Sequence, residues 1–339
     1  MTAARGRWSI AERLQVAPEV ASALAEGRPV VALESTLISH GFAYPANLEV
    51  AQGSEAAVRE SDAVPATVAI HAGRLLVGLD DAALEALATA ERWSVLKAAR
   101  PSLAPALARE GWAATTVSAT MIAAHAAGIT VFATGGIGGV HRATGSAAIG
   151  SAGPGVSLDI SSDLDELART PMAVVCAGPK AILDVANTLE VLETRGVPVV
   201  AVGQAVLPGF YARSAGVVAP LNVPDEAAAA VLVAAHLGLG LGSGILVCVP
   251  VPADSALSEA TARDAVDAAT READNAGIHG PELTPWLLAR IATLTNGASV
   301  RANTALITNN ARVAGRLARA LVEGSKMAPD SIAARSARR

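Results

Sequence analysis

The chain has 339 residues, of which 52% are hydrophobic, 17% are charged and 3% are aromatic, and its formal net charge is −5. This composition is typical of a globular protein and excludes an intrinsically disordered one. Arginines and acidic residues are interleaved without a basic stripe, so the sequence lacks the electrostatic footprint of a nucleic-acid-binding protein.

A membrane location is also disfavoured, although the mean hydropathy is high at +0.41. No segment of the sequence approaches the ~18 consecutive uncharged apolar residues that a spanning helix needs. Residues 1–15 carry charges where a signal peptide needs an apolar stretch. We therefore expect no membrane contact and a cytoplasmic location. Cys176 and Cys248 lie inside apolar runs without metal-ligand spacing, which indicates reduced, buried thiols.

Short β-branched runs alternate with Ala-rich helical patterns along the chain. The strand candidates, in chain order, are 29–33, 65–70, 74–79, 129–136, 172–178, 197–203 and 244–252. The helix candidates are 46–62, 80–91, 101–110, 179–195, 225–238 and 256–275. This alternation predicts the α/β class, with a largely parallel sheet covered by helices on both faces as an α/β/α sandwich.

The sequence contains no tandem repeat or long linker, so we expect one domain over 1–323. The segment 142–158 is rich in Gly, Ser and Ala and is predicted to be a flexible loop. The basic segment 324–339 is predicted to be a disordered tail.

Lysine is rare in this chain, since only three of its 26 Lys and Arg residues are lysines. One of them, Lys180, directly follows an apolar run in "MAVVCAGPKAILD". Gly178 and Pro179 before it are typical of a strand end and a helix start, so we place Lys180 in the first helical turn. The positive end of the helix dipole there favours the neutral, nucleophilic amine. We expect a Schiff-base or phosphate-binding role, and the alternative is a structural lysine.

Glu34 is the first charged residue after the buried-strand pattern "VVAL". The carboxyl ends of parallel strands are where α/β sheets gather their ligands. Partial desolvation at such a position raises the pKa of a carboxyl group toward general acid or base duty. Glu34 is therefore a candidate catalytic residue.

A glycine-rich run follows the strand candidate at 129–136, in "TVFATGGIGGVHR". Glycines let backbone amides approach an anion, and His141 with Arg142 adds positive charge, so the run favours a phosphate or another oxyanion. The dinucleotide fingerprint is not met, because His141 occupies its third glycine position, and no Walker loop is present.

The segment "LDISSDL" carries Asp159, Ser161, Ser162 and Asp163. Carboxylates and hydroxyls suit a hard cation, Mg²⁺ or Mn²⁺, that keeps most of its waters. The alternative is an ordinary helix start, with a serine as N-cap and Asp163 in the first turn.

Taken together, the motifs closely resemble the pseudouridine-5'-phosphate glycosidases, also called the indigoidine synthase A-like family. The resemblance runs from about residue 16 to residue 322 and rests on "VALESTLISHG", "PATVAI", "ATTVSATM", "VFATGGIGGVHR", "DISSDL", "VVCAGPKAILD" and "TLEVLETRGVPVV". It implies a single α/β/α domain, a homotrimer, and action on the carbon-carbon bond between ribose 5-phosphate C1' and uracil C5.

The resemblance also implies roles for individual residues. Lys180 would form an imine with C1' of the ring-opened sugar, and Glu34 would donate the proton. Asp159 would bind the metal, Mn²⁺ with Mg²⁺ as the alternative. The family pattern implies substrate contacts at Lys97, Val117, Ser161, Ser162, Asp163 and Asn303. His141, the anion-binding candidate, is a further expected substrate contact.

This chain departs from the family pattern on the side of the aglycone, the group joined to C1'. The loop at 142–158 is longer, "VGQA" at 202–205 replaces "GYQT", and "CVPVP" at 248–252 replaces "NPIP". We therefore favour a C-glycosynthase that joins ribose 5-phosphate to a natural-product ring, an aromatic or nucleobase-like aglycone. The alternative is a pseudouridine-5'-phosphate glycosidase that releases uracil and ribose 5-phosphate. Weaker rivals are a non-catalytic sugar-phosphate sensor and a phosphosugar aldolase.

Overall fold

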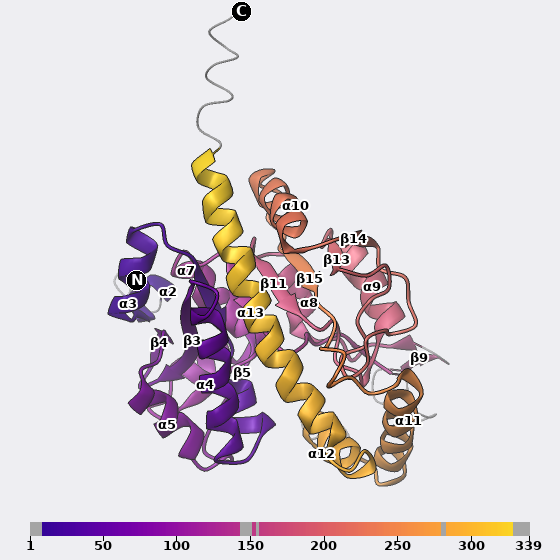
Figure 1. Cartoon of the computed structure of the whole chain (residues 1–339). Coiled ribbons are helices and arrows are strands. Elements are labelled where there is room, and N and C mark those ends of the chain that lie inside the picture. The colour runs from indigo at the N-terminus through magenta and orange to yellow at the C-terminus, as the bar shows by residue number, and fades with distance from the viewer. Residues whose placement is uncertain (1–8, 143–150, 154–155, 279–282, 328–339) are drawn as a thin grey trace, which may run out of the picture.

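A central sheet of eleven strands organises the molecule (Figure 1). The computed structural model describes residues 9–142, 151–153, 156–278 and 283–327. The sheet consists of β1 (Leu14–Val16), β2 (Val30–Leu33), β3 (Val64–His71), β4 (Arg74–Val77), β5 (Leu96–Ala98), β6 (Ala113–Thr115), β7 (Val131–Ala133), β11 (Ala173–Cys176), β13 (Val199–Val202), β14 (Leu221–Val223) and β15 (Ile245–Cys248). Their main order is β1-β4-β3-β2-β7-β11-β15-β13-β14, with β6 paired to β3 and β5 paired to β6.

The sheet is largely parallel, as predicted. All neighbours from β3 through β2, β7, β11, β15 and β13 to β14 pair in parallel. The antiparallel pairs of this sheet, in the part of the chain that the structure describes, are β3 with β4 and β3 with β6. Every residue of β2, β7, β11, β13 and β15 is buried. Strands covered on both faces explain why these runs are apolar without alternation.

Helices cover both faces of the sheet and complete the predicted α/β/α sandwich. They are α2 (Ile10–Arg13), α3 (Pro18–Ala25), α4 (Ala46–Arg59), α5 (Asp81–Thr89), α6 (Leu103–Leu107), α7 (Val117–Ala126), α8 (Ser162–Leu167), α9 (Val185–Thr194), α10 (Glu226–Gly238), α11 (Glu259–Asn275), α12 (Leu283–Leu294) and α13 (Ala298–Met327). Helices α4, α10 and α13 pack on one face, and α3, α7, α8 and α9 pack on the other. The long helix α13 crosses the sheet between α4 and α10 (Figure 1).

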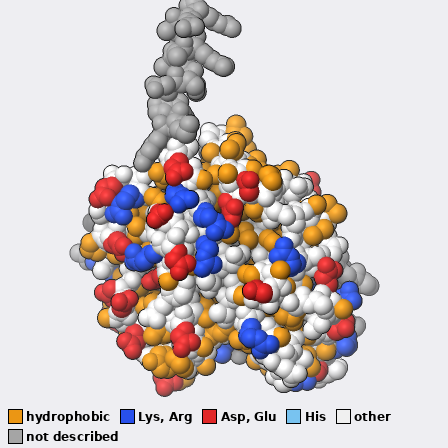
Figure 2. All heavy atoms as spheres, in the orientation of Figure 1, with side chains coloured by type: hydrophobic (Ala, Val, Ile, Leu, Met, Phe, Trp, Pro, Cys, Tyr) orange, Lys and Arg blue, Asp and Glu red, His pale blue; other side chains and the backbone are white. Residues whose placement is uncertain are grey.

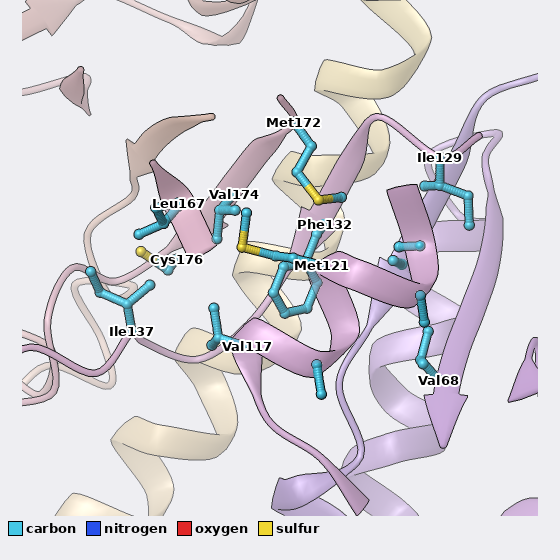
Figure 3. Packing of buried hydrophobic residues seen from close by; sticks show 14 of the residues in the cluster. Val68, Val117, Met121, Ile129, Phe132, Ile137, Leu167, Met172, Val174 and Cys176 are labelled. Carbon is cyan, nitrogen blue, oxygen red and sulfur yellow. The ribbon is translucent and has the colours of Figure 1, made fainter. Parts of the chain in front are cut away.

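The face of the sheet under α7 and α8 carries a continuous apolar core. Phe132 of β7 and Val174 of β11 pack there with Met121 and Val117 of α7 (Figure 3). Each large side chain buried in this way contributes about 1.5–3 kcal/mol to the free energy of folding. The core therefore fixes the N-terminus of α7 against the sheet.

Charged side chains are interspersed on the α13 face of the molecule (Figure 2). Arg312 pairs there with Glu60, Arg316 with Glu226, and Arg319 with Asp62. On this face both signs of charge are mixed, in line with the interleaved charges of the sequence. No helix of the described residues is long and apolar enough to cross a membrane.

The predicted helix 179–195 is wrong at its start, because α9 begins only at Val185. Asp184 is the N-cap, and its carboxylate accepts a hydrogen bond from the Asn187 amide at 3.0 Å. Upstream, the Lys180 amide donates to the Ile137 carbonyl at 3.1 Å, so the chain pairs with the glycine-rich run instead of turning into a helix. A short strand, β12 (Leu183–Asp184), continues this pairing with β8 (Val140–His141).

The predicted tail 324–339 is wrong for its first four residues, because α13 continues to Met327. The remaining residues of that tail lie outside the described residues, as do 143–150 and 154–155 of the predicted flexible loop. The described parts of that loop form a short antiparallel pair, β9 (Ser151–Gly153) with β10 (Val156–Ser157). The domain assignment 1–323 stays a prediction.

Candidate active site

The candidate site lies where the strand order of the sheet reverses. From β2 the chain continues to β3 on one side, whereas from β7 it continues to β11 on the other. Such a switch point leaves a crevice at the carboxyl ends of the strands, where open α/β sheets bind their ligands. Glu34 directly follows β2, Thr134 directly follows β7, and Lys180 follows β11 after a short turn.

Glu34 is buried and hydrogen-bonded in the way a general acid requires. The Thr134 hydroxyl donates to Glu34 Oε1, and Glu34 is only 8% exposed. Burial raises the pKa of the Glu34 carboxyl, while the charge of Lys180 and the Thr134 hydrogen bond oppose that rise. The proton is therefore held to a higher pH than on an ordinary glutamate.

Lys180 lies in the turn before β12, so the helix-dipole argument made for it does not apply. It is half-buried. Its positive charge opposes the rise in the pKa of Glu34. The same charge adds to the fall in the pKa values of Lys97 and His141. The structure thus brings Lys180 together with three of the predicted site residues.

Lys97 enters the same site from β5. Much of its side chain is exposed, but protein surrounds its amine closely enough that desolvation lowers the pKa of Lys97. The charge of Lys180 lowers that pKa further, and the carboxylates of Asp163 and Glu34 oppose both effects. Two amines and two carboxyl groups, from four separate segments of the chain, therefore share one site.

His141 and Asp159 lie side by side at the edge of this cluster. The His141 amide donates to the Asp159 carbonyl at 2.9 Å. Desolvation lowers the pKa of the His141 imidazole, and the Asp159 carboxylate opposes that shift. The imidazole is thus near Asp159, Lys180 and Lys97, as a phosphate-binding role requires.

A metal ion at Asp159 would have few protein ligands. No group of three or more His, Cys, Asp or Glu side chains among the described residues is arranged to hold a cation. Mg²⁺ and similar hard cations often keep several waters and use one or two carboxylates together with substrate phosphates. The metal at Asp159 remains a prediction.

Both carboxylate oxygens of Asp163 accept backbone hydrogen bonds. Its Oδ1 accepts from the Ser118 amide, and its Oδ2 accepts from the Gly138 amide, both at 3.0 Å. Ser161 is the N-cap of α8, and its hydroxyl accepts from the Asp163 amide at 3.3 Å. The helix-start alternative therefore describes Ser161 and Asp163, while the Ser162 hydroxyl contacts the Ser118 hydroxyl at 3.3 Å.

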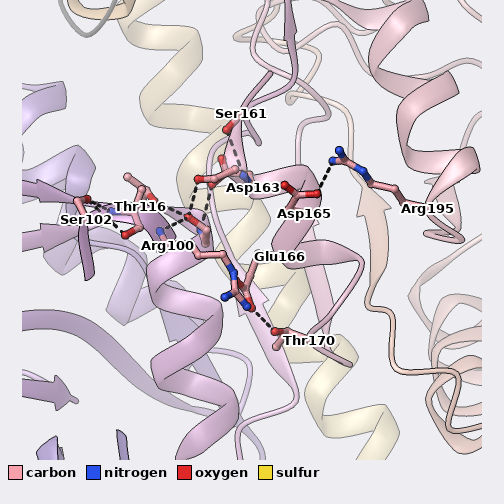
Figure 4. Close-up of polar contacts among 12 residues, drawn as sticks. Arg100, Ser102, Thr116, Ser161, Asp163, Asp165, Glu166, Thr170 and Arg195 are labelled. Atoms are coloured by element: carbon pink, nitrogen blue, oxygen red, sulfur yellow. Dashed lines mark hydrogen bonds and ion pairs between the residues drawn. The ribbon is translucent and has the colours of Figure 1, made fainter. Parts of the chain in front are cut away.

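Glu166, a second carboxylate of α8, also holds this part of the site in position. Glu166 is 1% exposed, and its carboxylate accepts from Arg100 Nε at 2.5 Å and from the Thr170 hydroxyl. Figure 4 shows Asp163 and Glu166 on α8 beside Thr116 and Arg100. The two carboxylates tie α8 to α7 and to the segment after β5.

The glycine-rich run serves close packing. A Cβ on Gly136 would lie 2.6 Å from the Phe210 ring, and one on Gly138 would collide with the Ser161 side chain. The Gly138 amide already donates to Asp163. The structure therefore accounts for these glycines without an anion.

Val117 lies on α7, on one face of the sheet, and Asn303 lies on α13, on the other. Val117 is the first residue of α7 and its side chain is buried, so its backbone is the part that could meet a ligand. Asn303 lies on the same face of α13 as Ile307 and Asn310. Ile307 packs against Gly135, and Asn310 Nδ2 donates to the Thr134 carbonyl at 2.9 Å.

Sequence reasoning missed Thr134, the hydrogen-bond partner of Glu34. The rule that selected Glu34 could have found it, because Thr134 is the first polar residue after the buried strand β7. Asn310 gave no comparable signal, since it is one of several polar residues on the long helix α13.

Comparisons with known proteins agree with these features. Residues 19–320 match the family model described as indigoidine synthase A like protein. The chain is 52% identical over 308 residues to a pseudouridine-5'-phosphate glycosidase of Paracoccus denitrificans, covering 91% of this chain and 98% of that protein. It is 53% identical over 307 residues to one of Rhodospirillum centenum, covering 90% and 91%.

Two solved structures share the fold. One is the prealnumycin C-glycosynthase AlnA in complex with ribulose 5-phosphate, at 38% identity and a TM-score of 0.82, covering 92% of this chain and 98% of that one. The other is an indigoidine synthase A-like protein of Thermotoga maritima, at 28% identity and a TM-score of 0.79, covering 91% and 96%. The C-glycosynthase is thus less similar than the glycosidases, and the preference for a synthase is not supported. The chain belongs to the indigoidine synthase A-like family.

Proposed function

We propose that this protein is a pseudouridine-5'-phosphate glycosidase, which releases uracil and ribose 5-phosphate. The observation that carries the proposal is the pairing of Lys180 with Glu34, an acid whose pKa is raised by burial, at the switch point of the sheet. Relatives about half identical to this chain bear that name.

The C-glycosidic bond explains why a lysine is needed. It offers no leaving oxygen to protonate, so the paired carboxylates of ordinary glycosidases would not help. The Lys180 nitrogen would displace the ring oxygen from C1', and the proton that the nitrogen loses would pass to that oxygen. The nitrogen lone pair would then form the C1'=N bond. The electron pair of the C1'–C5 bond moves to C5 of uracil, which receives the Glu34 proton. Water adds to the imine carbon and releases ribose 5-phosphate with the free amine.

The other predicted residues would bind the substrate. Lys97 and His141 supply positive or hydrogen-bonding groups for the phosphate, and a cation held through waters by Asp159, Mn²⁺ in the first instance, would neutralise further charge. Val117, Ser161, Ser162, Asp163 and Asn303 remain proposed substrate contacts, and the Asp163 carboxylate would also hold the site together. A homotrimer remains proposed from the family resemblance.

A direct assay tests the proposal. The purified protein with Mn²⁺ should release uracil from pseudouridine 5'-phosphate at ordinary enzymatic rates of ~1 to 10³ per second. Lys180→Ala should abolish release. Lys326→Ala should not, because Lys326 follows Ser325, which lines a cavity with Pro29 and Val30 at the amino end of β2, whereas the site lies at the carboxyl ends of the strands. Imine formation with ribose 5-phosphate but no release of uracil would favour the synthase instead. Imine formation with triose phosphates in place of ribose 5-phosphate would favour an aldolase.

A further inference from the structure

A small cavity lies behind Glu34, between the sheet and helices α4 and α13. Its apolar lining consists of Leu33, Leu37, Ile38, Ala51, Ala133 and Ile307. Its polar lining consists of Glu34, Ser54, Thr67 and Thr134. The volume accessible to the centre of a water molecule is about 10 Å³. That is close to the minimum of about 10–15 Å³ that one water needs.

The polar groups of this cavity suit one bridging water. The Ser54 hydroxyl donates to the Val50 carbonyl at 2.8 Å, and the Thr134 hydroxyl donates to Glu34. The Thr67 hydroxyl donates to Glu55 Oε1 at 2.5 Å. Because each hydroxyl hydrogen is already used, the oxygen lone pairs are available to accept hydrogen bonds from a water. A buried water typically has two to four such partners.

Glu55 connects the rear of the cavity to solvent. It lies on α4 and is half-buried, whereas Glu34 and Thr67 are buried. Desolvation raises the pKa of Glu55, the Thr67 hydrogen bond and the charge of Arg59 oppose the rise, and Asp81 and Glu19 add to it. A carboxyl group in this position can exchange protons with solvent and with Thr67.

We propose that Glu34 recovers its proton from the rear of the site, through a water in this cavity, the Thr67 hydroxyl and Glu55. The proposal rests on the proposed function, in which each cleavage transfers the Glu34 proton to C5 of uracil. Protonation of Glu55 reverses its hydrogen bond with Thr67, so that Glu55 donates to the Thr67 oxygen and the Thr67 hydroxyl turns toward the water. The Glu55 proton then passes to the Thr67 oxygen, the Thr67 hydrogen passes to the water, and a hydrogen of the water passes to Glu34. One proton enters at Glu55 and one arrives at Glu34, with no other bond changed.

The geometry favours this route while substrate occupies the front of the site. Leu33 of β2 pairs with Thr67 of β3 on one side. On the other side, Leu33 pairs with Ala133 of β7. Glu34, which follows Leu33, therefore lies next to the strand that carries Thr67, whereas Thr134, which follows Ala133, lies on the opposite side of β2. The chain of groups is short, and it runs between the sheet and α4.

Two variants break the relay without removing the catalytic residues. Thr67→Val deletes the hydroxyl at similar volume, and Glu55→Gln keeps the shape but cannot transfer the proton. We expect each to lower kcat for uracil release by about tenfold or more, a part of the 10²–10⁴-fold that a general acid contributes. Borohydride trapping of ribose 5-phosphate on Lys180 should be unchanged. Thr67→Ser retains the hydroxyl, is the matched control for Thr67→Val and should keep most of the wild-type kcat.

Chemical rescue separates a relay from a structural role. Rising imidazole concentration should restore Glu55→Gln, because a small donor can replace a half-buried carboxyl group, but should not restore Thr67→Val. The relay is wrong if both variants keep the wild-type kcat, or if imidazole does not relieve the loss in Glu55→Gln. Neither result would contradict the proposed glycosidase activity. A wild-type protein that releases no uracil overturns the proposed function and the relay with it.

Discussion

Removing the Asp163 carboxylate should destabilise the protein strongly. In Asp163→Ala, the amides of Ser118 and Gly138 lose the partner that each binds at 3.0 Å. A buried donor left unsatisfied costs about 1–3 kcal/mol. Ser118 lies in the first turn of α7, so a further 0.3–1 kcal/mol, roughly, comes from losing a negative charge at a helix N-terminus. The two amides and the helix terminus together predict a loss of about 2–7 kcal/mol in the free energy of unfolding.

Urea unfolding followed by circular dichroism measures this loss. Asp165→Ala is the matched control on the same helix, because Asp165 forms an ion pair with Arg195 while 46% exposed. Exposed pairs contribute about 0–1 kcal/mol, so this variant should remain close to the wild type. If Asp163→Ala is no less stable than Asp165→Ala, the Asp163 carboxylate does not hold α7 and the glycine-rich run in place. Substrate binding would then be its one proposed role.

The other predictions concern Glu34 and the cation. Glu34→Gln should lower kcat for uracil release by about 10²–10⁴-fold while ribose 5-phosphate is still trapped on Lys180. Burial raises the folded-state pKa of Glu34, so its contribution to stability is full below the unfolded-state pKa and is lost as the pH rises through the folded-state pKa. Urea unfolding should therefore show that the free energy of unfolding of Glu34→Gln rises relative to that of the wild type as the pH increases. A difference between the two proteins that does not change with pH would contradict this. Thr134→Val removes a hydrogen bond that lowers the pKa of Glu34, so the fall of kcat/KM at high pH should move to higher pH, and an unshifted profile would argue against that bond. Exhaustive chelation should abolish uracil release and Mn²⁺ should restore it, whereas Asp159→Ala should need more Mn²⁺, and full activity after chelation would exclude the cation.

Most of the sheet could be predicted from the sequence, because strands buried on both faces are continuous apolar runs. Each predicted strand segment contains a strand of the central sheet. Four three-residue strands, β1, β5, β6 and β14, were not predicted, since three residues are too few to show a period. The start of α9 was misplaced because Gly178 and Pro179 suggested a helix, while pairing with Ile137 and capping by Asp184 decided the conformation.

The site was predictable in part. Glu34 could be found because it follows a buried strand. Lys97 gave no local signal and was selected only through the family resemblance, since its neighbours lie far away in the sequence. Asp163 was a candidate ligand because acids beside serines suit a cation, but its partners are backbone amides of two distant segments. The preference for a synthase rested on changes at 202–205 and 248–252, which did not outweigh overall similarity to glycosidases.

Trapping of the intermediate tests the central claim most directly. The protein is incubated with Mn²⁺ and pseudouridine 5'-phosphate, treated with borohydride during turnover, digested and mapped by mass spectrometry. We predict a reduced ribose 5-phosphate adduct on Lys180, its absence in Lys180→Ala, and uracil release in the same wild-type reaction. Uracil release with an adduct on Lys97 or Lys326, or with no adduct at all, would contradict the account.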